Sequence, residues 1–317
     1  MAEKLAVVAI GGNSLIKDKN SVSVEDQYLA AKETTYHIAD MLEAGWNVAI
    51  GHGNGPQVGF ILRRSEIAHR AENMHEVPLD VCGADSQGAI GYALQQTLQN
   101  ELKRRGIKRS VATVVTQVLV DKEDNAFKNP TKPIGGFMDE VEAKKRETDL
   151  GWNVVEDSGR GWRRVVASPI PQEVVELPSV KALLDAGQVV ITVGGGGIPV
   201  IEENGYLKGT AAVIDKDYAS SLLAREIKAE LFIISTAVEK VALNFGKPDE
   251  KWLDKMTLSE AKAYLAEGTH FAKGSMAPKM QAIIWYMEAG GKQALITNPE
   301  NIGRALKGET GTWITQD

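Results

Sequence analysis

The chain has 317 residues, enough for a large hydrophobic core and one or two domains. Its net charge of −6 argues against a general nucleic-acid-binding surface, and no apolar run approaches the roughly 20 residues that span a bilayer. A single cysteine, Cys82, excludes an intrachain disulfide and a thiolate metal cluster. We therefore expect a cytoplasmic protein that binds neither nucleic acid nor membrane.

Strands and helices alternate along the chain. Short runs rich in Val and Ile predict strands, and longer segments with spaced apolar residues predict helices. This alternation is typical of a mainly parallel sheet with helices on both faces. The predicted strands are 5–10, 46–50, 110–120, 189–193, 231–235 and 293–297, and the predicted helices are 24–44, 84–104, 219–229 and 276–289. A further helix is expected to start near Pro56.

The segment 121–168 interrupts this alternation, because it is polar, highly charged and rich in Gly and Pro. A disordered insertion is one interpretation. Trp152, Trp162 and the run 165–167 nevertheless supply apolar anchors of a kind that disordered segments usually lack. We interpret 121–168 as a small inserted lid that protrudes from the main domain.

Four glycine-bearing segments each stand at the end of an apolar run: AIGGNSL (9–15), GHGNGPQVG (51–59), VGGGGIP (193–199) and KGSMAPK (273–279). Ligands bind at the carboxyl ends of parallel strands, and glycine lets backbone amides approach an anion. For the first segment alone, a tight turn is the simpler interpretation. The glycines at 51–55 and 194–197 favour a bound phosphate, although neither a Walker motif nor GxGxxG is present. His52 is expected only to pack or hydrogen-bond locally.

Three lysines lie on separate segments and are candidates for neutralising a phosphoryl group. Lys216 stands between Asp215 and Asp217 at a predicted helix start, where simple surface charge is the alternative. Lys279 lies in the first turn of a helix, where a cation opposes the helix dipole and a bound phosphate would offset that cost. Lys132 lies in the predicted lid. Convergence of all three on one transferring phosphoryl group is the hypothesis.

The residues then resemble a known family. AIGGNSL, GHGNGPQVG, PLDVCGADSQGAIGY, NPTKPIG, RGWRRVVASPIP, VGGGGIPV, AVIDKDYAS, ISTAVEKV with NFGKP, and GSMAPK occur in the order seen in carbamate kinases, of the amino-acid kinase superfamily. The resemblance spans essentially the whole chain. It implies an open three-layer α/β/α sandwich with a mainly parallel sheet and a protruding subdomain. It also implies a homodimer with its nucleotide-binding half at about 190–317, and phosphoryl transfer between ATP and carbamate in arginine catabolism, with carbamoyl phosphate and ADP as the other pair.

The resemblance also implies site residues, carried over motif by motif. The phosphate-neutralising residues would be Lys132, Lys216 and Lys279, and Asp217 would orient lysines by ion pairing. The residues facing carbamate or the phosphoryl group would be Gly11, Gly12, Asn13, Gly53 and Asn54. The nucleotide would contact Gly195, Gly196, Ala237, Val238, Val241 and Met276. Mg²⁺ is expected to accompany ATP or ADP, and no protein metal ligand is assigned.

The chemistry agrees with this resemblance. Carbamate is already an anion at neutral pH, so phosphoryl transfer to it needs alignment and charge neutralisation rather than a general base. Two alternatives stay open at this point. One is another carboxylate kinase of the superfamily, of the acetylglutamate type, which would need a larger acceptor pocket. The other is a nucleotide-binding regulator without catalysis, against which the three lysines and Asp217 argue.

Overall fold

The computed structural model describes residues 4–12, 15, 21, 23–157, 159, 161–272 and 274–317. Its centre is an eight-stranded sheet. Neighbouring described strands pair in parallel, except for the β16–β17 pair. The predicted mainly parallel sheet is therefore confirmed. The strand order is β15 (Lys255–Thr257), β17 (Thr312–Thr315), β16 (Gln293–Thr297), β12 (Leu231–Ser235), β1 (Lys4–Ile10), β2 (Trp46–His52), β9 (Val189–Ile191) and β3 (Val111–Thr113).

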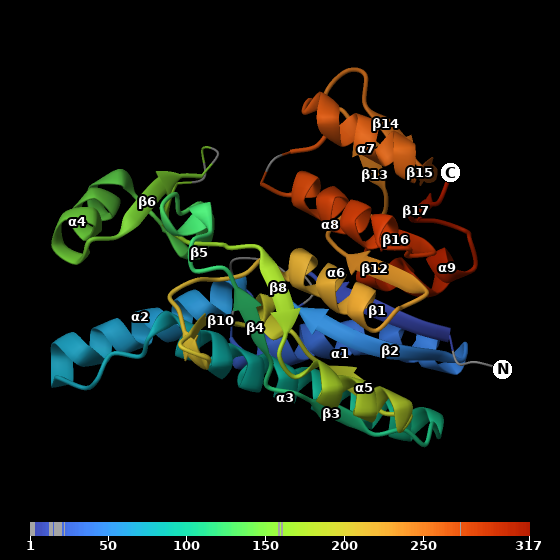
Figure 1. Cartoon of the computed structure of the whole chain (residues 1–317), viewed down its shortest axis with the longest axis horizontal. Coiled ribbons are helices and arrows are strands. Elements are labelled where there is room, and N and C mark those ends of the chain that lie inside the picture. Colours follow the sequence, from blue (N-terminus) through green and yellow to red (C-terminus); the bar gives the residue numbers. More distant parts are fainter. Residues whose placement is uncertain are drawn as a thin grey trace.

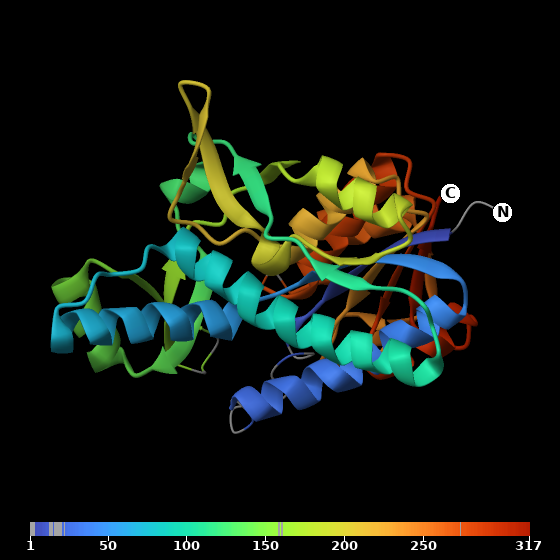
Figure 2. The ribbon, with the colours of Figure 1, turned by 90° about the horizontal axis from the view of Figure 1, so that it is seen from below.

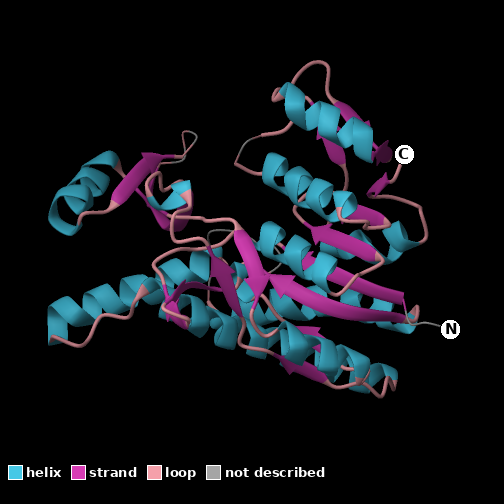
Figure 3. Cartoon of the chain, in the orientation of Figure 1, coloured by secondary structure: helices cyan, strands magenta, loops and turns pink. Residues whose placement is uncertain are grey.

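Helices cover both faces of this sheet, which gives three layers (Figures 2 and 3). Successive side chains of a strand point to opposite faces. Val7 and Ala9 of β1 therefore pack against one helical layer, and Val8 and Ile10 against the other. The first layer contains α5 (Leu177–Asp185), α6 (Lys216–Glu226), α7 (Leu258–Glu267) and α8 (Met276–Glu288); the second contains α1 (Val24–Glu43), α3 (Leu79–Arg105) and α9 (Ile302–Leu306).

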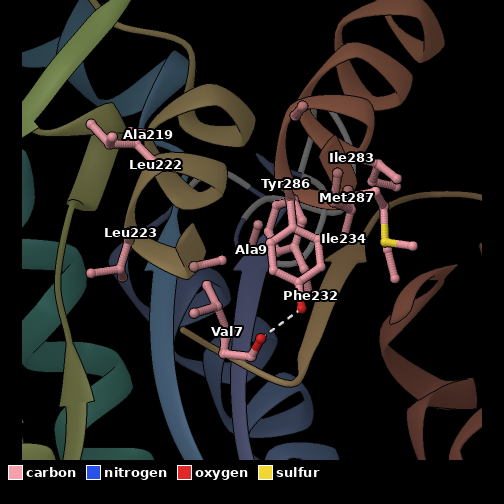
Figure 4. Close-up of a cluster of buried hydrophobic side chains, with 14 of the residues drawn as sticks. Val7, Ala9, Ala219, Leu222, Leu223, Phe232, Ile234, Ile283, Tyr286 and Met287 are labelled. Atoms are coloured by element: carbon pink, nitrogen blue, oxygen red, sulfur yellow. Dashed lines mark hydrogen bonds between the residues drawn. The ribbon is translucent and has the colours of Figure 1, made fainter. Parts of the chain in front are cut away.

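Figure 4 shows the core on the α6 and α8 side of the sheet. Phe232 of β12 meets Tyr286 of α8 edge to face, with ring centroids 5.5 Å apart. The Tyr286 hydroxyl donates to the backbone carbonyl of Ala229 at 2.7 Å, so burying the ring leaves no unpaired polar group. Burial raises the pKa of Tyr286 to about 12. This packing fixes the helices whose first residues reach the candidate site.

Predicted helices 24–44 and 276–289 correspond to α1 and α8, whereas the predicted helix 84–104 begins earlier, at Leu79. The predicted helix 219–229 begins at Lys216, because the Asp215 side chain caps it by accepting from the amide of Asp217. Among the described residues, no helix combines the length and apolar character needed to cross a membrane.

The predicted single strand 110–120 is wrong. The chain forms two short strands in different sheets, β3 and β4 (Gln117–Val120). Thr116, which is fully buried between them, donates its amide to the side chain of Gln87 at 2.9 Å and its hydroxyl to the carbonyl of Val114 at 2.7 Å. These bonds turn the chain out of the main sheet.

The second sheet has the order β11 (Tyr206–Gly209), β10 (Ile198–Glu203), β4 and β8 (Pro171–Val174). Its β10–β11 hairpin projects from the body of the molecule and is coloured gold in Figure 2. A separate two-stranded sheet pairs β13 (Val241–Leu243) with β14 (Lys251–Leu253). Two short 3₁₀ turns, η3 (Gly194–Gly196) and η4 (Pro299–Asn301), follow β9 and β16.

The segment predicted to protrude is folded. It contains η2 (Asn125–Phe127), α4 (Glu140–Leu150) and an antiparallel sheet of β5 (Lys132–Met138), β7 (Trp162–Val166) and β6 (Asn153–Glu156), in that order. In Figure 1 this subdomain stands at the upper left, away from α7 and α8. Its strand β5 packs on α2 (Gly55–Glu72) so closely that a Cβ on Gly59 would lie 2.1 Å from the Cα of Gly135. The limits 121–168 and 190–317, and the function of the subdomain as a lid, stay predictions.

Candidate active site

A cavity of about 400 Å³ lies beside the carboxyl ends of β1, β2 and β12. This is the edge at which parallel α/β sheets bind ligands. The turns after the strands, the first residue of β5 and the starts of α6 and α8 all contribute to its wall. The predicted residues that line it are Gly11, Gly12, Gly53, Asn54, Lys132, Gly195, Lys216, Asp217, Ala237 and Lys279.

Asp217 joins two of the candidate lysines. Its Oδ2 accepts a hydrogen bond from Lys279 Nζ at 2.8 Å, and its Oδ1 accepts from Lys216 Nζ. The side chain of Asp217 is only 3 % exposed, and those of Lys216 and Lys279 are 12 % and 14 % exposed. One buried carboxylate thus holds two ammonium groups that come from the first turns of α6 and α8.

The electrostatics of this cluster favour an incoming anion. Burial lowers the pKa of Lys216, and the nearby charge of Lys279 lowers it further, against the attraction of Asp217. Burial alone would raise the pKa of Asp217, but Lys216 and Lys279 outweigh it and the net pKa is lowered. For Lys279, Asp217 outweighs burial and the pKa is raised. Two crowded cations therefore share one carboxylate, and a phosphate would relieve their mutual repulsion.

The third lysine reaches the same cavity from the protruding subdomain. Lys132 Nζ donates to Asp215 Oδ2 at 2.6 Å. Burial would raise the pKa of Asp215, but Lys132 outweighs it and the net pKa is lowered. The structure therefore brings Lys132, Lys216 and Lys279 to one cavity from positions far apart in the sequence. Their roles in catalysis stay predictions.

The glycine turns at the cavity are shaped by the sheet. The amide of Gly11 donates to the carbonyl of Ser235 at 3.0 Å, and the amide of Gly53 donates to the carbonyl of Ile10 at 3.0 Å. These two amides therefore extend the strand pairing and are not free to bind an anion. A Cβ on Gly53 would lie 3.3 Å from Cδ of Lys216, so the missing side chain makes room for the lysine. Asn13 lies outside the described residues.

The family model described as "Amino acid kinase family" matches residues 4–298. The chain belongs to the amino acid kinase family. It is 49 % identical over 315 residues to the "Carbamate kinase" of Thermococcus kodakarensis, covering 99 % of this chain and 100 % of the relative. It is 52 % identical over 318 residues to the Escherichia coli "Carbamate kinase-like protein YqeA", covering 100 % of both chains. The structure "Carbamate kinase from Giardia lamblia bound to AMP-PNP" matches with a TM-score of 0.91 and 42 % identity, over 100 % of this chain and 99 % of that one.

This membership confirms the amino-acid kinase fold. The sequence predicts that the four glycines at 194–197 favour a bound phosphate. A Cβ on Gly194 would lie 2.4 Å from Nε2 of His52, and one on Gly196 would lie 2.4 Å from the carbonyl of Ile214. These glycines are required by packing within the protein, and only Gly195 lines the cavity.

The predicted nucleotide residues after β12 occupy unequal positions. Ala237 is exposed and lines the cavity, and Val238 is half-buried beside it in the sequence. Val241 is fully buried, pairs with Leu253, and donates its amide to the Thr312 hydroxyl at 2.8 Å. Its side chain therefore belongs to the core and offers no surface to a ligand in this structure. Met276 is the half-buried first residue of α8 and does not line the cavity.

Two polar side chains follow β2 at the edge of the site. His52 is buried, its Nδ1 lies 3.0 Å from the carbonyl of Gly53, and burial lowers its pKa to about 4. His52 is thus neutral at physiological pH, with Nδ1 as the donor, and bonds locally as the sequence predicts. Asn54 donates its side-chain amide to Ser86 Oγ at 2.9 Å, which fixes the residue before α2.

The role of Asp215, which both caps α6 and pairs with Lys132, was not predicted from the sequence. The available signal was an Asp immediately before a helix, a position where its side chain favours capping. Thr236 and Ser275 also line the cavity; they lie within the motifs ISTAVEKV and GSMAPK but were not singled out as site residues. Within the described part of the chain, no group of three or more His, Cys, Asp and Glu side chains is placed to hold a metal ion.

Proposed function

We propose that this member of the amino acid kinase family is a carbamate kinase, which transfers a phosphoryl group reversibly between ATP and carbamate. Relatives named carbamate kinase from three organisms are 47–49 % identical to it over almost their full lengths. The observation that carries the proposal is the meeting of Lys132, Lys216 and Lys279 around one cavity at the sheet edge. The chemistry is that of an ATP-dependent phosphotransferase.

The charged groups account for the main demand of the reaction. Phosphoryl transfer spreads negative charge over the oxygens of the migrating group, so positioned cations lower the barrier. Each ammonium group has three donors, and one bond to a carboxylate leaves donors for phosphate oxygens. The first turns of α6 and α8 also line the cavity, and the dipoles of these helices favour negative charge there. Carbamate, an anion already, needs no base to attack.

We infer that the nucleotide binds on the side of the cavity formed by the exposed loop that contains Ala237. The phosphoryl acceptor would then bind on the opposite side, near Gly53 and Asn54. AMP-PNP in the Giardia lamblia carbamate kinase supports nucleotide use here. Mg²⁺ would enter with ADP or ATP as part of the substrate, where it neutralises phosphate charge and takes few protein ligands. From the resemblance to carbamate kinases we also propose a cytoplasmic homodimer that makes ATP in arginine catabolism.

The acceptor is the part of the proposal most in need of a direct test, because the YqeA relative is named only carbamate kinase-like. The assay is ATP formation from ADP, Mg²⁺ and carbamoyl phosphate, with acetyl phosphate and N-acetylglutamyl phosphate offered in parallel. We expect turnover with carbamoyl phosphate to exceed that with the other donors at least tenfold. Faster transfer from N-acetylglutamyl phosphate would assign an acetylglutamate-type kinase, and nucleotide binding without any transfer would assign a regulator.

A further inference from the structure

The contact between Lys132 and Asp215 joins two parts of the molecule at the site. Lys132 is the first residue of β5, and Asp215 precedes α6 by one residue. The neighbouring backbone is joined as well, because the amide of Val213 donates to the carbonyl of Ala167 at 2.9 Å, at the end of β7. The backbone of Lys132 is therefore placed by its pairing with Val166 of β7, and its ammonium group by the carboxylate of Asp215.

The two oxygens of Asp215 have different partners. Oδ1 accepts from the backbone amide of Asp217 at 2.9 Å, which caps α6, and Oδ2 accepts from Lys132 at 2.6 Å. Capping alone does not require a charge, since Asn, Ser and Thr cap helices nearly as well as Asp. Only a carboxylate both caps the helix and neutralises Lys132. The second partner therefore explains why an acid suits this position.

We propose that Asp215 is a positioning residue for phosphoryl transfer, which holds the Lys132 ammonium group over the cavity as Asp217 holds those of Lys216 and Lys279. The proposal rests on the proposed function. Lys132 is 28 % exposed and Lys279 only 14 %, so Lys132 has less packing to hold its long side chain. Without its carboxylate partner, the side chain of Lys132 would sample many rotamers. The entropy cost of ordering that side chain would then be added to the barrier at each turnover.

The variant Asp215→Asn separates the two functions of the residue, because asparagine keeps the cap and removes the charge. We expect kcat for ATP formation from carbamoyl phosphate to fall about 10- to 100-fold, with little change in KM for ADP or in Tm. Asp139→Asn is the matched control. Asp139 caps α4 in the same way, accepting from the amide of Glu142 at 2.8 Å, and we expect its variant to keep wild-type kcat.

A double-mutant cycle tests whether Asp215 acts through Lys132. In a Lys132→Ala background, Asp215→Asn is expected to change kcat by less than about twofold. An undiminished effect of Asp215→Asn in that background would overturn the proposal and assign Asp215 to the helix alone. Wild-type kcat in the single variant, or a change confined to KM for ADP, would also overturn it.

A second measurement needs no activity and so separates this proposal from the proposed function. Competitive acetylation of the ligand-free protein, followed by peptide mass spectrometry, reports the accessibility of Lys132 relative to the exposed Lys181. Asp215→Asn should raise the relative labelling rate of Lys132 several-fold. An unchanged labelling rate would overturn the proposal even in an active enzyme. A raised labelling rate would support the positioning of Lys132 by Asp215 even if wild type transferred no phosphoryl group from carbamoyl phosphate.

Discussion

Two regions of the molecule bring cations to one cavity, and they are built differently. Lys216 and Lys279 lie in the first turns of α6 and α8, whose inner faces are buried against the central sheet in the core that Figure 4 shows. Lys132 begins a strand of the small protruding sheet, whose residues are mostly half-buried or exposed. Packing on the central sheet and one buried carboxylate, Asp217, therefore place the first two lysines. The third is placed by a smaller apolar cluster that includes Ile134, Val166 and Val58 of α2, and by its ion pair with Asp215. We call β1, β2 and β12 together with α6 and α8, which hold Lys216 and Lys279, the packed floor, and β5, β6, β7 and α4 the tethered subdomain.

The largest effect is expected from Lys216→Ala, which removes a cation from the packed floor. We predict that kcat falls roughly 10²- to 10³-fold, the usual cost of removing one preorganised donor to developing charge. Steady-state assays of ATP formation measure it, and circular dichroism checks the fold. Lys208→Ala, at a lysine that is 65 % exposed on β11, is the control and should keep wild-type turnover. Near-normal kcat in a folded Lys216→Ala protein would remove Lys216 from the mechanism.

The next prediction compares the free energies of unfolding that are lost when Asp217 and Asp215 are each replaced by asparagine. Asp217→Asn leaves two largely buried ammonium groups without their shared carboxylate, and removing one partner of a buried ion pair costs about 3 kcal/mol or more. Asp215→Asn leaves only one, partly exposed ammonium group, that of Lys132, without its carboxylate, and it keeps the helix cap. We therefore expect a cost of about 1 kcal/mol. Urea denaturation at pH 7 gives both values. Equal losses in the two variants would show that floor and subdomain do not differ in this way.

The sequence predicts the strands of the floor well, because their side chains are buried on both faces and read as unbroken apolar runs such as Ala6–Ile10. It places Lys216 and Lys279 at helix starts. It does not predict the partner of Lys279, because Asp217, which already offsets the cost of a cation at a helix start, lies 62 residues away in the sequence. It gives no sign that packing also requires the glycines at 194–197, because the side chains that require them, such as those of His52 and Val118, come from other segments. Phosphate binding by these glycines stays a prediction. Pairings of this kind depend on tertiary contacts that a local pattern does not contain.

His52 provides a pH test of the packed floor. A histidine in an unfolded chain has a pKa near 6.5, and burial lowers that of His52 to about 4. Between these pH values the unfolded chain binds more protons than the folded protein, so stability falls as the pH is lowered from 6.5 to 4. The difference amounts to at most about 3 kcal/mol. Below pH 4 this contribution no longer changes.

The measurement is urea denaturation at several pH values between 6.5 and 4, for wild type and for His52→Asn. Asparagine can donate to the carbonyl of Gly53 but does not titrate, so the variant should lose less stability over this range. His69→Asn is the matched control for the change of residue type, because exposed His69 bonds to the carbonyl of Met74 through the same ring nitrogen. Parallel pH profiles for wild type and His52→Asn would contradict the buried, neutral histidine.

The smallest effect is expected in the protruding subdomain, at Arg164 of β7. Its guanidinium lies 4.5 Å from the centre of the Trp152 ring and donates to Glu66 of α2 at 3.0 Å. Arg164→Met keeps much of the side-chain volume and removes the charge. Arg63, whose Nη1 lies 3.4 Å from the other oxygen of Glu66, still neutralises that carboxylate. We therefore expect the subdomain to lose only about 1 kcal/mol.

That loss should be local. Hydrogen exchange of β6 and β7 in the ligand-free protein should become roughly fivefold faster, the factor that corresponds to about 1 kcal/mol. Exchange in β1 and β2 should stay unchanged, because these strands lie in the packed floor. Arg164→Lys keeps the charge but loses the planar stacking on Trp152, and should give an intermediate rate. Arg104→Met, at an exposed arginine paired with Glu101, is the control. Faster exchange in β1 and β2 of Arg164→Met would mean that the subdomain and the sheet unfold together, and the contrast between them would then fail.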